Sequence, residues 1–523
     1  MTFRIKDFTL FLSLVSLLSC AVVVHPTGGP EDREAPFVLS SSPDSNQTAF
    51  HKTVLVIRFN EYVTIKDPNG IILSPPPQQK PKLLVIGKEL HIGLKELRSN
   101  TTYNLTLYNA IADINEENIL PAYSISFSSG EELDSGTITG RVIDRLVKSP
   151  LNNITVILLP EKVTDSVSFP LFVTKTDPSG NFRFQNLPSG KQFSIAAFED
   201  INSNYRAEPD EKFGYAETFL VNDTTALQLE LSSQNTKVIP QVMKVNPVSK
   251  HRTKISVKNL SSNNYIINSI SSSDKREKLY VNHFHPDTLL VFDTYIYNNN
   301  DKMYLLTNSN GEALDTLSFQ SNETLPDSLI IQSSVQGTYR LSDSLFIRFS
   351  NPVTGIDTSQ ISILKDSITP IPFTTQTIDL FTLYLDFEKQ SETHYTVFYR
   401  KAAFKDVLGQ ASKPDTINLV TDGAEDYGTI SLSWPLLTGS AYIIQLLKDP
   451  TKEPDFTFYS SQNKFTTPLI PKGEYHIRII YDANQNKAFD GVTPLKSQPE
   501  KVLLHREIVK VSSKWTLELN LVD

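Results

Sequence analysis

The 523-residue chain has one cysteine, Cys20, and the long stretch that follows it has no thiol at all. Disulfide bonds, thiolate catalysis and cysteine-ligated zinc are therefore excluded from that stretch, and its stability must come from hydrophobic cores. The chain also lacks a second run of 18 apolar residues and any block of like charge. No further segment is therefore expected to span a membrane. A nucleic-acid partner is not expected either, because the net charge of the chain is −9.

The N-terminus has the layout of a secretory signal peptide, predicted to span residues 1–19. Arg4 and Lys6 precede an apolar run at 8–18 that is too short to span a bilayer. The sequence Leu-Leu-Ser-Cys at 17–20 resembles the lipobox of bacterial lipoproteins, which implies lipidation of Cys20 and removal of the preceding peptide. Acyl chains on Cys20 would anchor the protein to a membrane, with residues 20–35 as a tether. An ordinary signal peptide and an uncut apolar anchor are the alternatives.

The remainder predicts an all-β protein. Short runs rich in β-branched and aromatic residues, such as 53–59 and 102–107, alternate with turn signals such as Asp-Pro-Asn-Gly at 67–70. Sustained helical periodicity is absent, and one helical turn is expected at 94–97. Regular short strands at this spacing indicate β-sandwiches.

An internal repeat gives the domain map. Phe59 recurs as Phe349, Tyr103 as Tyr395 and Gly136 as Gly428, at offsets of 290, 292 and 292 residues. We therefore expect tandem sandwiches in an A-B-C-A-B order, because a fixed offset marks duplicated units. The predicted domains are A (36–132), B (133–236), C (237–326), A′ (327–425) and B′ (426–523).

Two family resemblances accompany the repeat. Domain A resembles the SbsA-type bacterial Ig-like domain, on the residues at 35–37, 58–61, 100–103 and 112–115. Domain B resembles prealbumin-like or carboxypeptidase-regulatory-like sandwiches, on the residues at 136–142, 176–182 and 187–190. The whole chain resembles Ig-like-domain lipoproteins of Bacteroidota, which implies architecture and location but no chemistry. In domain A, Tyr103 is expected to form a tyrosine corner.

Two loops suggest calcium, the one cofactor that the sequence indicates. In domain B, oxygen-bearing side chains stand at positions 1, 3, 5, 9 and 12 of an EF-hand-like loop: Asp200, Asn202, Asn204, Glu208 and Glu211. In domain B′ the corresponding residues are Asp482, Asn484, Asn486 and Asp490, with Thr493 a poor twelfth ligand. Tyr205 replaces the glycine that an EF-hand requires, so Asx turns at a strand end are the alternative. Any calcium is expected to bind the first loop first, because that loop has three carboxylates, Asp200, Glu208 and Glu211, and the second has only Asp482 and Asp490.

A second recurring pattern is Asp-Ser or Asp-Thr followed by an apolar residue or Thr. It resembles the O-glycosylation acceptor motif of Bacteroidota envelope proteins, and turn chemistry at loop ends is the simpler reading. The candidate acceptors are Ser166, Thr224, Thr288, Thr316, Ser328, Ser344, Ser367 and Thr416.

The sequence holds no His-Glu-x-x-His, Gly-x-Ser-x-Gly or phosphate-binding glycine loop, so we expect no enzyme. The function predicted is a lipid-anchored cell-envelope scaffold, spacer or binding arm in the outer membrane, with an envelope protein or glycan as partner. The resemblance to Bacteroidota lipoproteins implies an acidic cluster after the cysteine in members exported to the surface, and residues 21–24 lack one, so the periplasmic face is favoured. The alternative is a glycan-binding accessory lipoprotein of a polysaccharide-uptake system. It would need an exposed aromatic platform, for which the candidates are Tyr205, Phe213, Tyr215 and Trp515.

Overall fold

The computed structural model describes residues 32–160, 169–208, 210–221, 227–233, 241–258, 265–270, 278–285, 287–294, 301–308, 311, 313–320, 325–437, 439–492 and 499–522. The predicted signal peptide and Cys20 lie outside the described residues. Within them the regular elements are strands and the 3₁₀ turns Pro68–Gly70, Thr358–Gln360 and Ala424–Asp426, which confirms the all-β class. The helical turn expected at 94–97 is wrong, because these residues form an irregular loop in which the Leu94 side chain packs into the core of domain A. None of the described residues forms a helix with the length and apolarity that a membrane crossing requires.

Domain A is a sandwich of two main sheets. Its strands are β1 (Val38–Ser42), β2 (Val54–Phe59), β3 (Val63–Ile65), β4 (Ile71–Ser74), β5 (Lys82–Ile86), β6 (Glu89–Gly93), β7 (Thr102–Leu107), β8 (Ile111–Asp113) and β9 (Tyr123–Ser128). Sheet β1-β2-β6-β5 packs over sheet β4-β7-β9, and β3 pairs with β8. Leu55, Ile57 and Phe59 alternate into the core, as a half-buried strand requires.

Domain B is a sandwich of two sheets. Its strands are β10 (Gly136–Asp144), β11 (Thr155–Pro160), β12 (Phe172–Lys175), β13 (Asn181–Leu187), β14 (Gln192–Phe198), β15 (Phe213–Leu220) and β16 (Leu227–Leu231). The sheets are β13-β10-β16 and β12-β11-β14-β15, so β12 and β13 are both edge strands. In the first sheet β16 runs parallel to β10.

Domain C is a third sandwich. Its strands are β17 (Gln241–Pro247), β18 (Arg252–Lys258), β19 (Tyr265–Ser269), β20 (Leu279–His285), β21 (Thr288–Asp293), β22 (Asp301–Asn308) and β23 (Ala313–Gln320). The sheets β17-β18-β21-β20 and β19-β22-β23 enclose a core that includes Ile255, Leu289 and Tyr304.

Domain A′ repeats the plan of domain A. Its strands are β24 (Ile331–Ser333), β25 (Gly337–Tyr339), β26 (Leu345–Phe349), β27 (Val353–Ile356), β28 (Ile361–Lys365), β29 (Thr369–Ile371), β30 (Thr374–Asp379), β31 (Thr382–Asp386), β32 (His394–Tyr399), β33 (Phe404–Asp406) and β34 (Asp415–Thr421). Sheets β24-β26-β31-β30 and β25-β34-β32-β28-β29 pack together, and β27 pairs with β33 as β3 pairs with β8.

Domain B′ repeats the plan of domain B. Its strands are β35 (Tyr427–Ser433), β36 (Ala441–Leu447), β37 (Phe456–Ser460), β38 (Lys464–Pro471), β39 (Gly473–Asp482), β40 (Val502–Leu504), β41 (Val509–Val511) and β42 (Thr516–Asn520). Sheet β38-β35-β42 keeps the parallel pair of the first copy, now between β35 and β42. The other sheet runs β37-β36-β39-β40, with β41 also on β39.

Both copies of the Ig-like plan contain a tyrosine corner. The phenol oxygen of Tyr103 accepts a hydrogen bond from the backbone N–H of Arg98 at 2.6 Å, which confirms the expectation for domain A. Tyr395 does the same with the N–H of Gln390 at 2.8 Å. Each ring is buried, so the corner ties the start of a core strand to the preceding loop.

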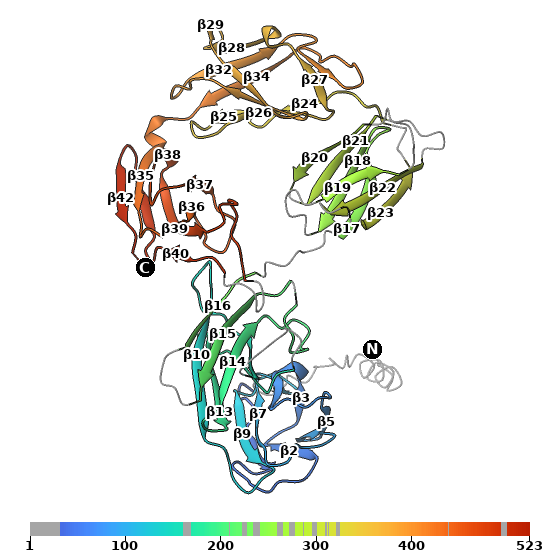
Figure 1. The fold of residues 1–523 in the computed structure, drawn as a ribbon, viewed down its shortest axis with the longest axis vertical. Helices are drawn as coiled ribbons and strands as arrows, with labels where there is room; N and C mark the ends of the chain where they lie inside the picture. Colours follow the sequence, from blue (N-terminus) through green and yellow to red (C-terminus); the bar gives the residue numbers. More distant parts are fainter. Residues whose placement is uncertain are drawn as a thin grey trace, which may run out of the picture.

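The chain folds back on itself, so that domain B′ returns to domain B and the domains B, C, A′ and B′ surround an open centre (Figure 1). Arg145 of domain B donates hydrogen bonds from Nε to the backbone oxygen of Glu500 at 2.9 Å and from Nη2 to that of Pro499 at 3.3 Å. The Val492 N–H donates to Ser232 Oγ at 3.0 Å. These contacts join residues that lie far apart in the sequence.

Apolar packing accompanies the polar contacts between domains B and B′. Leu146 of domain B packs against Ile443, Ile480 and Val502 of domain B′. Val492 is 1% exposed and joins a cluster that also holds Ile72 of domain A and Phe198 of domain B. Domains A, B and B′ therefore share one apolar junction, and the chain is not the extended spacer that a simple stack of sandwiches would make.

The joint between domains C and A′ is held by a buried arginine. The Arg252 side chain is 8% exposed and donates from Nη2 to the backbone oxygen of Pro326 at 2.9 Å. Its Nε lies 3.8 Å from Asp327 Oδ1, and the Asp327 backbone oxygen accepts from Asn351 Nδ2 of domain A′ at 2.9 Å. A buried charge with several partners fixes a joint more firmly than an exposed ion pair does.

Candidate functional site

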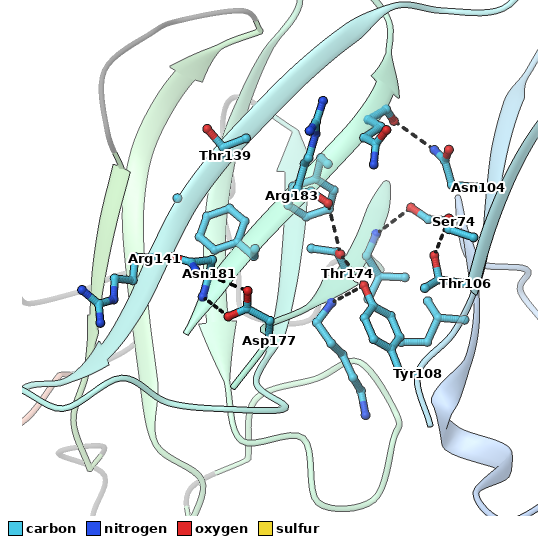
Figure 2. A pocket seen from close by; sticks show the side chains of 18 of the residues that line it. Ser74, Asn104, Thr106, Tyr108, Thr139, Arg141, Thr174, Asp177, Asn181 and Arg183 are labelled. Atoms are coloured by element: carbon cyan, nitrogen blue, oxygen red, sulfur yellow. Dashed lines mark hydrogen bonds between the residues drawn. The ribbon is translucent and has the colours of Figure 1, made fainter. Parts of the chain in front are cut away.

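A cleft lies where domain A meets the edge strands of domain B. The edge strands β12 and β13 of domain B face the outer side of sheet β4-β7-β9 of domain A, and the gap between them has a volume of about 600 Å³. Figure 2 shows the polar side chains from both domains that line it.

Side chains of domain A cap the backbone of the two edge strands. Ser74 Oγ accepts the Val173 N–H at 3.0 Å, and Asn104 Nδ2 donates to the Gln185 carbonyl at 2.9 Å. Tyr108 OH and Thr174 Oγ1 lie 3.0 Å apart, within hydrogen-bond distance (Figure 2). Covering edge strands in this way prevents pairing with other chains and fixes the angle between domains A and B.

The accessible wall of the cleft is polar. Thr139 and Arg183 are cross-strand neighbours on β10 and β13, as are Arg141 and Asn181 on the same strands, and all of them are exposed. Asn104, Thr106 and Ser124 contribute further hydroxyl and amide groups from domain A. The aromatic rings in the lining, Phe182 and Phe184, are each only 3% exposed and form the floor.

The acidic and basic side chains of the cleft differ in how far hydrogen bonds within the protein already engage them. The carboxylate of Asp177 already accepts hydrogen bonds from the backbone N–H groups of Ser179 and Asn181, at 2.9 and 2.8 Å. Arg141 uses its Nε on the Ser179 carbonyl at 3.1 Å, which leaves its terminal nitrogens outside that bond. Arg183 has no ion pair within the part of the chain that the structure describes. The free charge at this surface is therefore positive.

A buried lysine lies at the same domain junction. Lys175 ends β12 and is 9% exposed, and burial lowers the pKa of its ammonium group, while the nearby carboxylates of Asp67 and Asp200 oppose that shift. The Lys175 ammonium group lies near Asp200 of the first predicted calcium loop, where it would repel a divalent cation.

The first predicted calcium loop is closed by hydrogen bonds of its own. Asp200 Oδ1 accepts the Asn204 N–H at 3.0 Å and Oδ2 accepts the Tyr205 N–H at 3.2 Å. The side-chain amides of Asn202 and Asn204 both donate to Glu208 Oε1 at 2.9 Å. Glu211 accepts the N–H groups of Ile201 and Glu208, at 3.0 and 2.9 Å. The structure thus brings the predicted residues together, in the role of turn-forming groups.

The second loop reproduces this pattern bond for bond. Asp482 accepts the N–H groups of Asn486 and Lys487 at 3.0 and 2.8 Å, and the amides of Asn484 and Asn486 donate to Asp490 Oδ2 at 2.5 and 2.9 Å. Glu500 accepts the N–H groups of Ala483 and Asp490, at 2.8 and 2.9 Å.

Glu500 therefore takes the place of Glu211, and the choice of Thr493 for that position is wrong. The longer segment after Asp490 moves the acidic residue beyond a fixed twelve-residue count, and Thr493 lies outside the described residues. Burial raises the pKa of both Glu211 and Glu500. Glu500 gives the second loop three carboxylates as well, so the expectation that calcium binds the first loop first, which rested on three carboxylates against two, loses its basis.

Backbone geometry explains how Tyr205 can stand where an EF-hand loop has glycine. Ser203 and Tyr205 have φ of 55° and 60°, and Gln485 and Lys487 have 61° and 64° at the matching positions. Both loops thus use the left-handed conformation that an EF-hand assigns to glycine, without a glycine. In the described residues, no three His, Cys, Asp or Glu side chains are grouped as a metal site would require.

The predicted glycosylation acceptors are mostly accessible where they are described. Thr316, Ser328, Ser344, Ser367 and Thr416 are exposed. Thr288 is only 9% exposed at the start of β21, so it is a poor acceptor. Ser166 and Thr224 lie outside the described residues.

The predicted aromatic platform is not assembled. Phe213 is 5% exposed, and Tyr205 and Tyr215 pack against the junction cluster that contains Ile72 and Val492. Trp515, at 74% exposure, is the one candidate of the four with an accessible ring.

Comparison with known proteins identifies the first domain. Residues 32–129 match the family model of the bacterial Ig-like domain. The chain contains a bacterial Ig-like domain. This match covers the first domain, and it indicates no family of enzymes. No curated protein sequence matches the chain.

Several solved structures are similar to this chain at low identity. The major pilin subunit BcpA of Bacillus cereus is 12% identical, with 74% of this chain and 99% of that chain covered and a TM-score of 0.15. Domains 1–6 of surface layer protein SbsC are 10% identical, with 92% and 67% covered and a TM-score of 0.15. The human desmocollin-1 ectodomain is 10% identical, with 75% and 80% covered and a TM-score of 0.14. TM-scores this low carry no argument about domain arrangement or function.

Sequence patterns did not predict two features of the structure, the cleft and the contact between domains B and B′. The cleft is formed by residues of domains A and B whose polar character is ordinary for exposed strands, so no motif marks them. The contact between domains B and B′ joins Arg145 to the backbone oxygens of Pro499 and Glu500 and packs Leu146 on apolar residues of domain B′, and no motif in a single sequence marks these contacts.

Proposed function

We propose that this protein is a non-enzymatic, lipid-anchored scaffold of the cell envelope that presents a binding cleft near its anchored end. The contact of domain B′ with domain B is the observation that carries the proposal. It fixes the relative positions of domains that would otherwise be joined only by flexible linkers. The cleft between domains A and B is the surface that such a frame would hold in place.

The anchor follows from the sequence around Cys20. Diacylglycerol on Cys20 would hold the N-terminus in the outer membrane, and the absence of acidic residues at 21–24 favours its periplasmic face. The test is metabolic labelling with a fatty-acid probe and membrane fractionation of Cys20→Ala, with Ser13→Ala in the apolar run as control. Loss of label and of membrane association in Cys20→Ala alone supports the proposal, and retention of both overturns it. Protease treatment of intact cells then distinguishes the two faces.

The second candidate function is a glycan-binding accessory lipoprotein of a polysaccharide-uptake system. The cleft favours it over a purely structural role, because its accessible lining consists of hydroxyl, amide and guanidinium groups, which suit a polyhydroxylated ligand. The exposed ring of Trp515 lies in domain B′ and offers a separate stacking surface. Loss of growth on a polysaccharide after deletion would separate this function from that of a scaffold.

A further inference from the structure

We infer that the cleft between domains A and B binds an acidic oligosaccharide, through hydroxyl and amide groups on both walls and the guanidinium groups of Arg183 and Arg141. This inference rests on the proposed binding role of the cleft and names the class of ligand. It is drawn from the chemistry of the accessible groups, the balance of charge and the rigidity of the two walls.

The accessible groups suit a ligand with many hydroxyls. The exposed hydroxyl of Thr139 and the carboxamide of Asn181 stand on one wall, and Thr106 and Ser124, whose hydroxyl oxygens lie 3.0 Å apart, stand on the other (Figure 2 labels all but Ser124). A hydroxyl group with one partner can still take part in a further hydrogen bond, and the Oδ1 of Asn181, whose Nδ2 donates to Asp177, can accept one from a sugar hydroxyl. A volume of about 600 Å³ lies within the range of small-molecule sites.

The charge balance selects an acidic ligand. Arg183 stands directly across from Thr139 in the β10–β13 pair, so its guanidinium belongs to the same wall as the hydroxyls. The one carboxylate in the lining, Asp177, is engaged by the N–H groups of its own turn. A guanidinium group binds a carboxylate by two parallel hydrogen bonds, which an uncharged sugar cannot offer.

The walls are held before any ligand arrives. The bonds from Ser74 to Val173 and from Asn104 to Gln185 fix domain A on domain B, and the Ile72 side chain, 2% exposed, is packed into the junction that also contains Val492. A preformed cleft loses less entropy on binding than a flexible one, so a modest number of polar contacts suffices for measurable affinity.

The test is isothermal titration calorimetry on the full-length chain carrying Cys20→Ser, with tetragalacturonate as the acidic probe and maltotetraose as the neutral one. We expect tetragalacturonate to bind in preference to maltotetraose and to bind more weakly as salt is raised. Arg183→Ala is expected to bind tetragalacturonate about tenfold more weakly, the loss of one charge-assisted contact. Arg506→Ala removes the same charge from an exposed turn of domain B′ and is expected to leave binding unchanged.

Three results would overturn the inference. These are no binding of tetragalacturonate, equal binding of both probes, and equal losses in Arg183→Ala and Arg506→Ala, which would mean general charge attraction. None of them bears on the anchored scaffold, whose test is the labelling and fractionation of Cys20→Ala.

Discussion

Arg145 in domain B donates a hydrogen bond from its Nε to the backbone oxygen of Glu500 in domain B′, 355 residues further along the chain. The same guanidinium group makes an ion pair with Glu230 at 2.8 Å and is 17% exposed. One arginine therefore links the surface of domain B to the loop that closes domain B′.

Replacing Arg145 by alanine should loosen domain B′ from domain B. The change removes a bond to a carboxylate and leaves two carbonyl oxygens without their donor, a loss of about 2–3 kcal/mol at this partly buried site. Arg145→Lys should recover part of it, because one ammonium group can reach only some of these acceptors. Thermal melts of the full-length chain with each variant measure the loss, and identical melts for wild type and Arg145→Ala would contradict the role of the arginine.

Gly491 should tolerate no side chain. A Cβ at this position would lie 1.9 Å from the backbone oxygen of Ser233 in domain B, so Gly491→Ala must separate the two domains locally. Small-angle scattering should show a larger radius of gyration for this variant. Gly355→Ala is the matched control, since a Cβ there meets nothing closer than 3.4 Å. Unchanged scattering for Gly491→Ala would mean that the domains are not in contact in solution.

The two tyrosine corners should contribute equally to the free energy of unfolding. Tyr103→Phe and Tyr395→Phe keep the buried rings but remove the acceptors of the Arg98 and Gln390 N–H groups, at a cost of about 1 kcal/mol each. Tyr384→Phe is the control, because that hydroxyl bonds to Asp386 at an exposed position. Denaturant unfolding followed by tyrosine fluorescence compares the three. A loss in the control as large as in the corners would refute the special role of the corner.

The acidic loops should be needed for folding whether or not calcium is present. Asp200→Ala and Asp482→Ala each remove two backbone hydrogen bonds, so each should lower the melting temperature in chelator as well as in calcium. Equal melting of wild type and both variants in chelator would contradict the turn-forming role.

The calcium hypothesis makes a separate prediction. Binding to the native state would stabilise the full-length chain by about 2.7 kcal/mol at calcium a hundredfold above Kd. The two loops match bond for bond, but Lys175 lies beside the first, so Asp482→Ala should lose at least as large a share of that shift as Asp200→Ala. Equal melting of the wild type in calcium and in chelator would leave the loops as turns and nothing more.

The sequence predicts the fold well where local chemistry decides it. Alternation such as Leu55, Ile57 and Phe59 identifies a half-buried strand, and the loop before Tyr103 identifies the corner. The internal repeat predicts which copies share a plan, and the pattern Asp200-x-Asn202-x-Asn204 identifies residues that the fold does bring together.

The sequence fails where distant segments meet. Glu500 was missed because a longer segment separates it from Asp490, so a count of twelve residues selects Thr493 instead. The cleft was missed because Thr139 and Asn104 are ordinary exposed strand residues until domain A is placed against domain B. Contacts between sandwiches depend on how rigid bodies meet, and nearby residues in one sequence do not encode that.

The central claim is that domain B′ closes back on domain B to make a fixed frame. It is tested most directly by the distance between two spin labels, one on Gln228→Cys of domain B and one on Lys510→Cys of domain B′, in the full-length chain carrying Cys20→Ser. Both sites are exposed, and no other cysteine is present to be labelled. We predict a single narrow distance distribution for this chain and a broad one when Gly491→Ala is added. A broad distribution in both would contradict the closed frame.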